Sequence, residues 1–182
     1  MSNDKKVDPE TVLLTGASGF IGLHCVKQLI QSGYKVRGTV RSLEKQKLVQ
    51  EVMAANNLDT KNIEFNLLDL NSDSGWEASM VGCKYVMHVA SPFWIANPKN
   101  DAEMMTPAVD GTLRVLRAAK KAKVKRVILT SSIVSMMSSI RRGVFTPEDW
   151  TDVNYPNLNT YIKSKTLAEK AAWKFLDENK GP

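Results

Sequence analysis

The sequence predicts an α/β fold in which one parallel sheet carries helices on both of its faces. Short apolar runs of strand length alternate with longer amphipathic runs along most of the 182 residues. A glycine-rich turn follows the first apolar run, and no internal repeat, low-complexity tract or Gly/Ser linker divides the chain. Because strands that alternate with helices form parallel sheets wrapped on both faces, a doubly wound arrangement is expected. We therefore expect residues 1–182 to form one domain.

The first half of the chain contains three predicted strands. The run TVLLTG (11–16) has the continuous apolar character of a buried strand. In the next segment, FIGLHCVKQLIQSG, Gly33 is placed to end a helix. A second strand, a helix and a third strand are expected at 34–40, 44–55 and 63–69. The apolar face of the first helix is expected to contain Ile21, Cys25, Leu29 and Ile30.

The second half continues the alternation of strands and helices. A short helix is expected at about 76–80, before the strand KYVMHVA (84–90). A long amphipathic helix at about 101–122 precedes the fifth strand, VKRVILTSS (124–132). A final helix is expected to cover about 160–179.

Composition limits the kind of protein that this chain can be. Its 43% of hydrophobic and 24% of charged residues are typical of soluble globular proteins. The start, MSNDKKVDPE, lacks the apolar core of a signal peptide, and no apolar run approaches the roughly 20 residues of a membrane span. Cys25 and Cys83 have no metal-ligand spacing and are interpreted as buried free thiols. These observations predict a cytoplasmic protein with no metal site and no membrane partner.

The net charge of +6 raises the question of nucleic-acid binding. The densest basic stretch, KKAKVKR (120–126), has no interleaved aromatic residues that could stack on bases. It is better interpreted as the end of a helix, where lysines interact favourably with the helix dipole. We expect no nucleic-acid partner, whereas a small anionic ligand suits the basic balance.

The turn TGASGFIG predicts a dinucleotide-binding site. Gly16 permits a tight turn, Gly19 lets a pyrophosphate approach the main chain, and Gly22 lets the helix pack on the strand. The helix N-terminus then offers N–H groups and a positive dipole end to the phosphates. The spacing is one residue longer than in the G-x-G-x-x-G fingerprint. The residues expected to contact the cofactor here are Gly16, Ser18, Gly19, Phe20, Ile21 and Gly22.

The end of the second strand indicates which dinucleotide binds. An acidic residue there binds the ribose hydroxyl of NAD, whereas arginine accommodates the 2′-phosphate of NADP. The segment VRGTVRS contains Arg37 and Arg41 and no acid, and Arg41 falls just beyond the strand. Lys45 and Lys47 follow within reach of the same phosphate. We therefore predict NADP(H) as the cofactor, with Arg41 and Lys45 at its phosphate; the alternative is that Arg41 is an exposed loop charge.

Two other strand ends are expected at the same site. Asp69 follows the third strand, where its carboxylate suits the adenine amino group and Leu70 suits the adenine ring; Asp69 could equally cap a helix. HVASP (88–92) ends the fourth strand with small residues that leave room for the nicotinamide ribose. His88 lies inside this strand and is interpreted as a core histidine. The cofactor contacts expected here are Val89, Ala90 and Ser91.

The motif YIKSK predicts a proton donor. Tyr161 and Lys165 are four residues apart and therefore share one face of the final helix. A phenol has an unperturbed pKa of about 10, and a nearby ammonium lowers the pKa of a phenol by stabilising the phenolate. Lys165 could also bind nicotinamide ribose hydroxyls. TSS (130–132) ends the fifth strand on the ligand side, so Ser132 could hold a carbonyl oxygen that Tyr161 protonates. We predict Ser132, Tyr161 and Lys165 as the catalytic residues.

These residues resemble the extended short-chain dehydrogenase/reductase family and, within it, the dihydroflavonol reductase-like group. That group includes cinnamoyl-CoA, anthocyanidin, aldehyde and ketone reductases. The motifs that carry the resemblance span nearly the whole chain: TGASGFIG, TVRS, DL, HVASP, TSS and YIKSKTLAEKAAW. The resemblance implies a Rossmann-like fold and NADPH-dependent reduction of a small carbonyl substrate. It also places the catalytic serine at Ser132 rather than Ser131.

The chain departs from this group in three ways. Ala108 stands where many members carry an asparagine, which puts a relay role there in doubt. Met137 stands at about the place where dihydroflavonol reductases carry the asparagine that grips a ring hydroxyl, which favours a smaller or more apolar carbonyl compound. Family enzymes continue beyond the tyrosine helix into a substrate domain. We therefore expect the chain to be the N-terminal portion of a longer reductase.

Two other functions share some of these features. Nucleotide-sugar epimerases and dehydratases have the Tyr/Lys pair and the glycine turn, but they tend to retain NAD, and Arg41 counts against that cofactor. A non-catalytic NADP-binding module would need the glycine turn but not the catalytic residues. Relatives often dimerise through the helices expected at 101–122 and 160–179, so a homodimer is left open.

Overall fold

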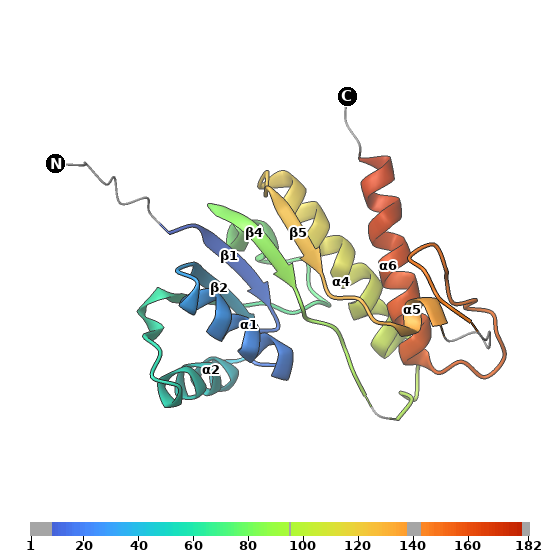
Figure 1. Cartoon of the computed structure of the whole chain (residues 1–182), viewed down its shortest axis with the longest axis horizontal. Helices are drawn as coiled ribbons and strands as arrows, with labels where there is room; N and C mark the ends of the chain where they lie inside the picture. Colours follow the sequence, from blue (N-terminus) through green and yellow to red (C-terminus); the bar gives the residue numbers. More distant parts are fainter. Residues whose placement is uncertain (1–8, 95, 138–142, 180–182) are drawn as a thin grey trace.

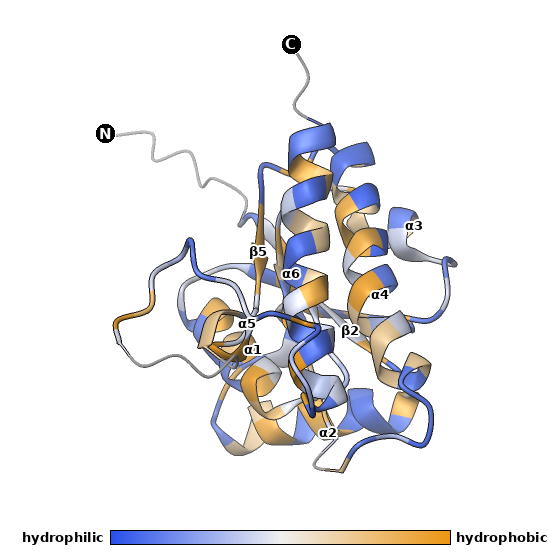
Figure 2. Ribbon diagram, turned by 90° about the vertical axis from the view of Figure 1, so that its right-hand side faces the viewer, coloured by the Kyte–Doolittle hydropathy of each residue, from blue (hydrophilic) through white to orange (hydrophobic). Residues whose placement is uncertain are grey.

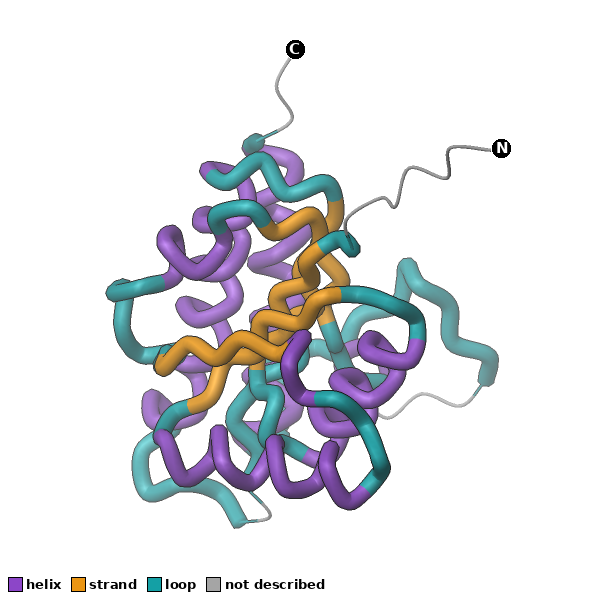
Figure 3. Tube along the Cα trace, turned by 90° about the vertical axis from the view of Figure 1, so that its left-hand side faces the viewer, coloured by secondary structure: helices purple, strands orange, loops and turns teal. Residues whose placement is uncertain are grey.

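In the described part of the chain, five strands form one parallel sheet in the order β3-β2-β1-β4-β5. A computed structural model describes residues 9–94, 96–137 and 143–179; residues 1–8, part of the stretch that lacks signal-peptide character, lie outside this description. Figure 3 shows the strands as a layer between helices. The predicted doubly wound α/β fold is confirmed. The strands are β1 (Thr11–Thr15), β2 (Lys35–Val40), β3 (Ile63–Leu67), β4 (Cys83–His88) and β5 (Arg126–Leu129).

The helices cover both faces of this sheet. Helices α1 and α2 pack on one face, where Val26 and Met53 meet apolar side chains of β1 and β2. Helices α3 and α4 pack on the other face, where Trp76 and Val115 meet side chains of β1 and β4. Helix α6 lies beside α4 (Figure 2). The helices are α1 (Phe20–Gln31), α2 (Leu43–Ala55), the 3₁₀ helix η1 (Thr60–Asn62), α3 (Trp76–Met80), α4 (Ala102–Lys121), α5 (Val134–Met137) and α6 (Thr160–Glu178).

Strand β1 lies at the centre of the sheet and is buried on both faces (Figure 1). Leu13 belongs to the apolar cluster with Val115 of α4, and Leu14 belongs to the cluster with Val26 of α1. A strand of a parallel sheet that is covered on both faces needs apolar residues at successive positions, which explains the continuous run TVLLT. The turn that follows β1 is therefore anchored to the most buried part of the molecule.

Helix α1 packs against the core through Cys25, Leu29 and Ile30 of its predicted apolar face, but not through Ile21. Gly22 and Val26 are its buried residues, whereas Ile21 is 52% exposed and Cys25 is only partly buried. A Cβ on Gly22 would lie 2.1 Å from the carbonyl oxygen of Gly16, so the helix turns this glycine toward the strand and Ile21 away from it. The prediction that Ile21 shares the inward face was wrong, as was the prediction of a buried thiol at Cys25.

Strands β4 and β5 end earlier than predicted. The hydroxyl of Thr15 accepts hydrogen bonds of 3.0 Å from the amides of Val89 and Ala90, so these residues leave the ladder after His88. Strand β5 ends at Leu129, and the chain then enters the short helix α5, which the sequence did not indicate. The carboxyl ends of β4 and β5 nevertheless lie on the same side of the sheet as the glycine turn.

Candidate functional site

The turn between β1 and α1 has the close packing that its glycines predict. Gly16 has φ +71°, and a Cβ on it would lie 3.0 Å from Cα of Ala90. Gly19 is the N-cap of α1 and has no side chain with which to cap it, so the positive end of the helix is open to an anion. Phe20 and Ile21 are exposed around this turn, and Ser18 is half-buried. The turn therefore presents main-chain N–H groups where a pyrophosphate is expected.

Arg37, within β2, and Arg41, directly after it, have different environments. Arg37 donates to the carboxylate of Glu64 at 2.7 Å and to the carbonyl oxygens of Ser79 and Val81, so its guanidinium is engaged inside the fold. Arg41 lies just after β2 and is exposed beside the N-terminus of α2. Of the two, only Arg41 is placed to meet a ligand.

The lysines that follow Arg41 also differ. The side chain of Lys45 is exposed in the first turn of α2, and its amide donates at 3.3 Å to Oγ of Ser42, which caps that helix. Lys47 forms an ion pair with Glu51 at 3.7 Å. Arg41 and Lys45 are thus two exposed cations at a positive helix end, which is a suitable environment for a phosphate.

The segment after β3 is fastened to α4. Asp69 Oδ1 accepts from the amide of Asn71 at 2.7 Å and forms a tight turn, so Asp69 is not the N-cap of α3, a position held by Gly75. Leu70 packs on Gly111 of α4, where a Cβ would lie 2.9 Å from Cβ of Leu70. Arg114 donates to the carbonyl of Leu70 at 2.6 Å. Gly111 and Arg114 were not singled out from the sequence.

The residues after β4 lie against the glycine turn. Val89, Ala90 and Ser91 are half-buried, and Ala90 is the close neighbour of Gly16. His88 is 2% exposed, which confirms its interpretation as a core histidine. Burial lowers the pKa of His88 to about 3, and the charge of Lys165 is a smaller cause in the same direction.

Lys165 is held at the end of β5. Its side chain is buried, and Nζ donates to the carbonyl oxygen of Thr130 at 3.1 Å. Burial lowers the pKa of Lys165, and the carboxylate of Glu169 partly opposes this shift. Thr130 immediately precedes the two serines after β5, and Tyr161 lies one helical turn before Lys165. The predicted catalytic residues therefore come from neighbouring parts of the fold.

The two serines after β5 have different partners. Ser131 donates to the carboxylate of Glu169 and is 3.1 Å from the hydroxyl of Ser135. Ser132 Oγ accepts from the amide of Val134 at 3.4 Å. Because a hydroxyl has one proton, the proton of Ser131 is committed to Glu169. Glu169 was not predicted as a site residue, and no local pattern signals its contact with a serine 38 residues away.

The first turn of α6 is fixed by three hydrogen bonds. The side chain of Asn159 caps the helix by accepting from Ile162 at 2.8 Å. The amide of Thr160 donates to Asn97 at 3.2 Å, and its hydroxyl donates to Asp101. These bonds hold the turn that carries Tyr161, whose ring makes an edge-to-face contact with Phe93 at 5.1 Å between centroids.

Residues 9–94, 96–137 and 143–179 contain neither a membrane-spanning helix nor a metal-binding cluster. Within these ranges no helix has the length and apolar character needed to cross a bilayer. The same ranges contain no cluster of three or more His, Cys, Asp or Glu side chains arranged to hold a metal ion.

Comparison with known proteins identifies the family of the chain. Residues 12–181 match the model of the NAD dependent epimerase/dehydratase family. The chain belongs to this family. Relatives similar in sequence include an anthocyanidin reductase of Vitis vinifera. It is 37% identical over 188 residues, which cover 98% of this chain and 55% of the relative. A dihydroflavonol 4-reductase of Dianthus caryophyllus is 35% identical over 176 residues, covering 93% and 49%.

Solved structures agree with the family assignment. The yeast methylglyoxal/isovaleraldehyde reductase Gre2, solved in complex with NADPH, has a TM-score of 0.79 and 31% identity and covers 93% of the chain and 53% of its own length. Gre2 of Candida albicans, also solved with NADPH, has a TM-score of 0.79 and 32% identity, covering 95% and 54%. The fold is therefore Rossmann-like, and the chain spans about half the length of the relatives that it matches.

Proposed function

We propose that the chain is the cofactor-binding and catalytic part of an NADPH-dependent reductase that converts aldehydes or ketones to alcohols. The observation that carries the proposal is the position of the buried Lys165. Lys165 lies one helical turn after Tyr161, and its ammonium donates to the carbonyl of Thr130, which is two residues before Ser132. An ammonium next to a phenol and a strand-end serine is the arrangement that a carbonyl reductase needs to protonate an oxygen.

The residues around the glycine turn fit NADP(H). Gly22 lets α1 pack closely on the turn, because a Cβ there would lie 2.1 Å from the carbonyl oxygen of Gly16, and the open N-terminus of α1 suits a pyrophosphate. Arg41 and Lys45 would hold the 2′-phosphate, and Asp69 with Leu70 would contact the adenine. Val89, Ala90 and Ser91 would border the nicotinamide ribose. The complexes of the two Gre2 proteins with NADPH support this cofactor.

The catalytic residues would divide the reaction as follows. NADPH, when bound, supplies the hydride that is added to the carbonyl carbon. Tyr161 donates the proton that the carbonyl oxygen gains, so the products are an alcohol and NADP⁺. Ser132 donates a hydrogen bond to the same oxygen, and Lys165 stabilises the phenolate that Tyr161 becomes. The proton is then restored to Tyr161 from solvent.

The exposed side chains near the strand ends favour an apolar carbonyl substrate. Phe93 and Trp94 follow β4 and are 65% and 44% exposed, and Ile133 follows Ser132 and is 66% exposed. Met137, at 42% exposed, adds a further apolar surface where a flavonoid reductase would offer an amide. We therefore favour a small or apolar aldehyde or ketone over a polyhydroxylated flavonoid.

We further propose that this chain is the N-terminal portion of a longer reductase. Strand β5 pairs only with β4 among the described strands, and its Ile128 is 48% exposed at the edge of the sheet. On α6, Trp173 and Leu176 are 55% and 46% exposed. A following segment that continues the sheet would cover this apolar surface. The free thiols of this chain, at Cys25 and Cys83, suit the reducing cytoplasm that the sequence predicts.

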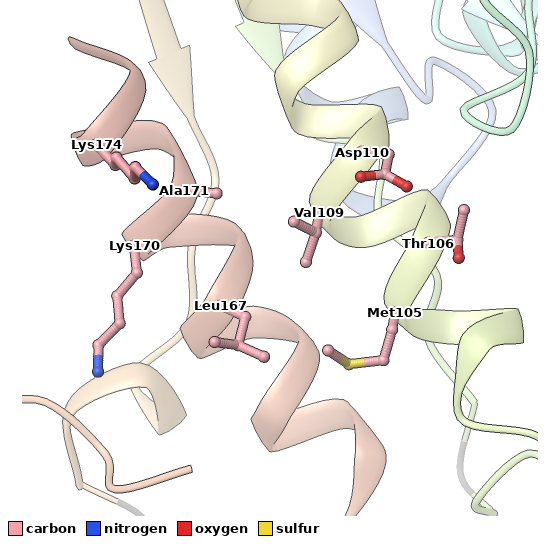
Figure 4. A pocket seen from close by; sticks show the side chains of 8 residues that line it. All are labelled: Met105, Thr106, Val109, Asp110, Leu167, Lys170, Ala171 and Lys174. Atoms are coloured by element: carbon pink, nitrogen blue, oxygen red, sulfur yellow. The ribbon is translucent and has the colours of Figure 1, made fainter. Parts of the chain in front are cut away.

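Self-association is proposed for the groove between α4 and α6. Figure 4 shows Met105 and Val109 of α4 facing Leu167 of α6. These residues line the groove, which has a volume of about 470 Å³. Asp110 lines the α4 side, and Lys170 and Lys174 line the α6 side, so two copies related by a twofold axis could pair opposite charges. Sedimentation velocity should show a dimer that Val109→Glu dissociates. A monomer at all concentrations would contradict this proposal.

A second candidate is an NAD-dependent epimerase or dehydratase, which the name of the family model favours. Arg41 and the absence of an acid in VRGTVRS speak against NAD.

A non-catalytic NADP-binding module is the third candidate. Replacing Tyr161 by Phe in the full-length protein separates an enzyme from the non-catalytic module. The reductase should lose about 10²- to 10⁴-fold in turnover while it retains NADPH binding. An unchanged turnover would contradict the proposed mechanism.

A further inference from the structure

A buried chain of hydrogen bonds connects β1, β4 and α4 next to the glycine turn. Its members are Thr15, His88 and Thr112, each at most 3% exposed. Thr15 Oγ1 lies 2.7 Å from Nδ1 of His88, and Thr112 Oγ1 lies 3.4 Å from Nε2 of the same ring. Thr15 is the last residue of β1 and immediately precedes Gly16. This series of hydrogen bonds therefore ends directly at the proposed cofactor site.

The position of each proton follows from the partners. Thr15 Oγ1 accepts from the amides of residues 89 and 90, both at 3.0 Å, which uses both of its lone pairs. Its own proton is therefore donated to Nδ1 of His88, which must be unprotonated. The neutral ring then carries its proton on Nε2 and directs it toward Thr112 Oγ1. The hydroxyl of Thr112 donates in turn to the carbonyl of Ala108 at 2.7 Å.

A charged imidazole does not fit this arrangement. A proton on Nδ1 would face a hydroxyl whose lone pairs are already occupied by two amides. The geometry thus requires the neutral Nε2–H tautomer, and the lowered pKa of His88 agrees with it. The charged group that acts on this ring is Lys165 of α6, which disfavours a second positive charge nearby.

His88 also connects the cofactor turns to the catalytic lysine through the main chain. Its carbonyl oxygen accepts from the amide of Thr130 at 3.0 Å, and the carbonyl of Thr130 accepts from Lys165 Nζ at 3.1 Å. On the other side, Ala90 lies against the glycine turn, because a Cβ added to Gly16 would lie 3.0 Å from Cα of Ala90. One residue therefore borders both halves of the proposed site.

We propose that His88 is a positioning residue: as the neutral Nε2–H tautomer it orients the hydroxyl of Thr15, which holds the turn after β4 against the glycine turn. His88 acts through Thr15 and does not contact the reacting atoms. The functional part of this inference rests on the proposed cofactor function, because the two turns are the expected contacts of the pyrophosphate and the nicotinamide ribose.

Two substitutions distinguish positioning from packing. Leucine fills the space of the ring but offers Thr15 no acceptor, whereas asparagine is smaller but can place Oδ1 near the position of Nδ1. Positioning predicts that His88→Leu weakens NADPH binding about tenfold and that His88→Asn stays within about threefold of the wild type. A role in packing alone predicts the opposite order, because Asn leaves a cavity. An order in which Leu binds better than Asn would overturn the proposal.

Two measurements without cofactor complete the test. The chain has two histidines, of which His24 is exposed, so the nitrogen resonances of His88 can be assigned with a His24→Gln variant. The proposal predicts an unprotonated Nδ1 and a protonated Nε2 in wild-type protein at neutral pH. A protonated Nδ1, or averaging between tautomers, would overturn it even if His88→Leu failed to fold.

Amide exchange tests the link to the turn directly. Exchange at Val89 and Ala90 should become at least tenfold faster in His88→Leu and stay near the wild-type rate in His88→Asn, while exchange in α2 is unchanged. Equal rates in both variants would refute positioning. If wild-type protein binds no NADPH, the proposed function fails, and the tautomer and exchange measurements still decide the role of His88.

Discussion

Ser131 donates a hydrogen bond to the carboxylate of Glu169, a residue of α6 that lies 38 positions later in the chain. This bond uses the proton of Ser131, whereas Ser132 accepts from the amide of Val134 and keeps its own proton for another acceptor. The structure thus distinguishes two adjacent serines that the resemblance distinguished only by position.

Replacing each serine by alanine should have different consequences. Ser132→Ala should lower kcat of the full-length protein about 10²- to 10³-fold, because a donor to the developing oxyanion is lost. Ser131→Ala should instead lower the free energy of unfolding by about 1 kcal/mol, with a much smaller effect on kcat. Steady-state kinetics and urea unfolding of both variants test this. A larger loss of kcat in Ser131→Ala would exchange the two roles.

The arginines provide a second matched pair. Arg41→Ala should weaken NADPH binding about tenfold or more and leave NADH binding nearly unchanged, because only NADPH has the 2′-phosphate. Arg37→Ala should leave the preference between the cofactors intact but destabilise the fold, since its bonds to Glu64 and to two carbonyl oxygens are lost. Titration with each cofactor measures both effects. An unchanged preference in Arg41→Ala would contradict the phosphate site.

Gly22 should be the least tolerant glycine of the turn. Its substitution by alanine places Cβ 2.1 Å from the carbonyl oxygen of Gly16, a contact that the backbone must move to relieve. At Gly19 the nearest atom would lie at 3.4 Å, and the residue has an ordinary φ of −77°. We expect Gly22→Ala to cost about 1–3 kcal/mol and Gly19→Ala clearly less, measured by denaturant unfolding. Similar losses would show that α1 can shift on the sheet.

Burial of His88 should make the fold sensitive to acid. The folded pKa of about 3 lies below the ordinary value of 6.5, so the unfolded state binds a proton that the folded state does not. The contribution of His88 is therefore complete above about pH 6.5 and is lost as the pH falls toward 3, with a slope of up to about 1.4 kcal/mol per pH unit. Unfolding free energies measured from pH 7 to pH 4 test this.

The control for this experiment is His88→Asn, which keeps the carboxylates that titrate in the same range. Glu10, for example, has its pKa lowered by its hydrogen bond to Lys84 and contributes in the same direction. The slope of the wild type should exceed that of the variant. Identical slopes would mean that His88 titrates equally in both states.

The parts of the fold that depend on local patterns were predictable from the sequence. The strand TVLLT and the glycine turn were correctly located, because a buried central strand is apolar throughout and a tight turn requires glycine. The direction of Ile21 and the engagement of Arg37 were not, because they depend on contacts with Gly16 and Glu64 that only the folded chain creates.

The same distinction applies to the candidate site. Tyr161 and Lys165 share a helical face that their spacing reveals. This helix is held in place by Asn97 and Asp101, which bind Thr160, and by Ser131, which binds Glu169. These partners come from other parts of the chain, and single polar residues of this kind carry no periodic signal. Long-range side-chain partners are therefore the part of the site that had to come from the structure.

The most direct test of the central claim is calorimetric titration of the 182-residue chain with NADPH and, separately, with NADH. NADPH should bind saturably and at least tenfold more tightly than NADH, because Arg41 and Lys45 meet a phosphate that NADH lacks. Equal or tighter binding of NADH would contradict the assignment and favour an epimerase-like use of the fold.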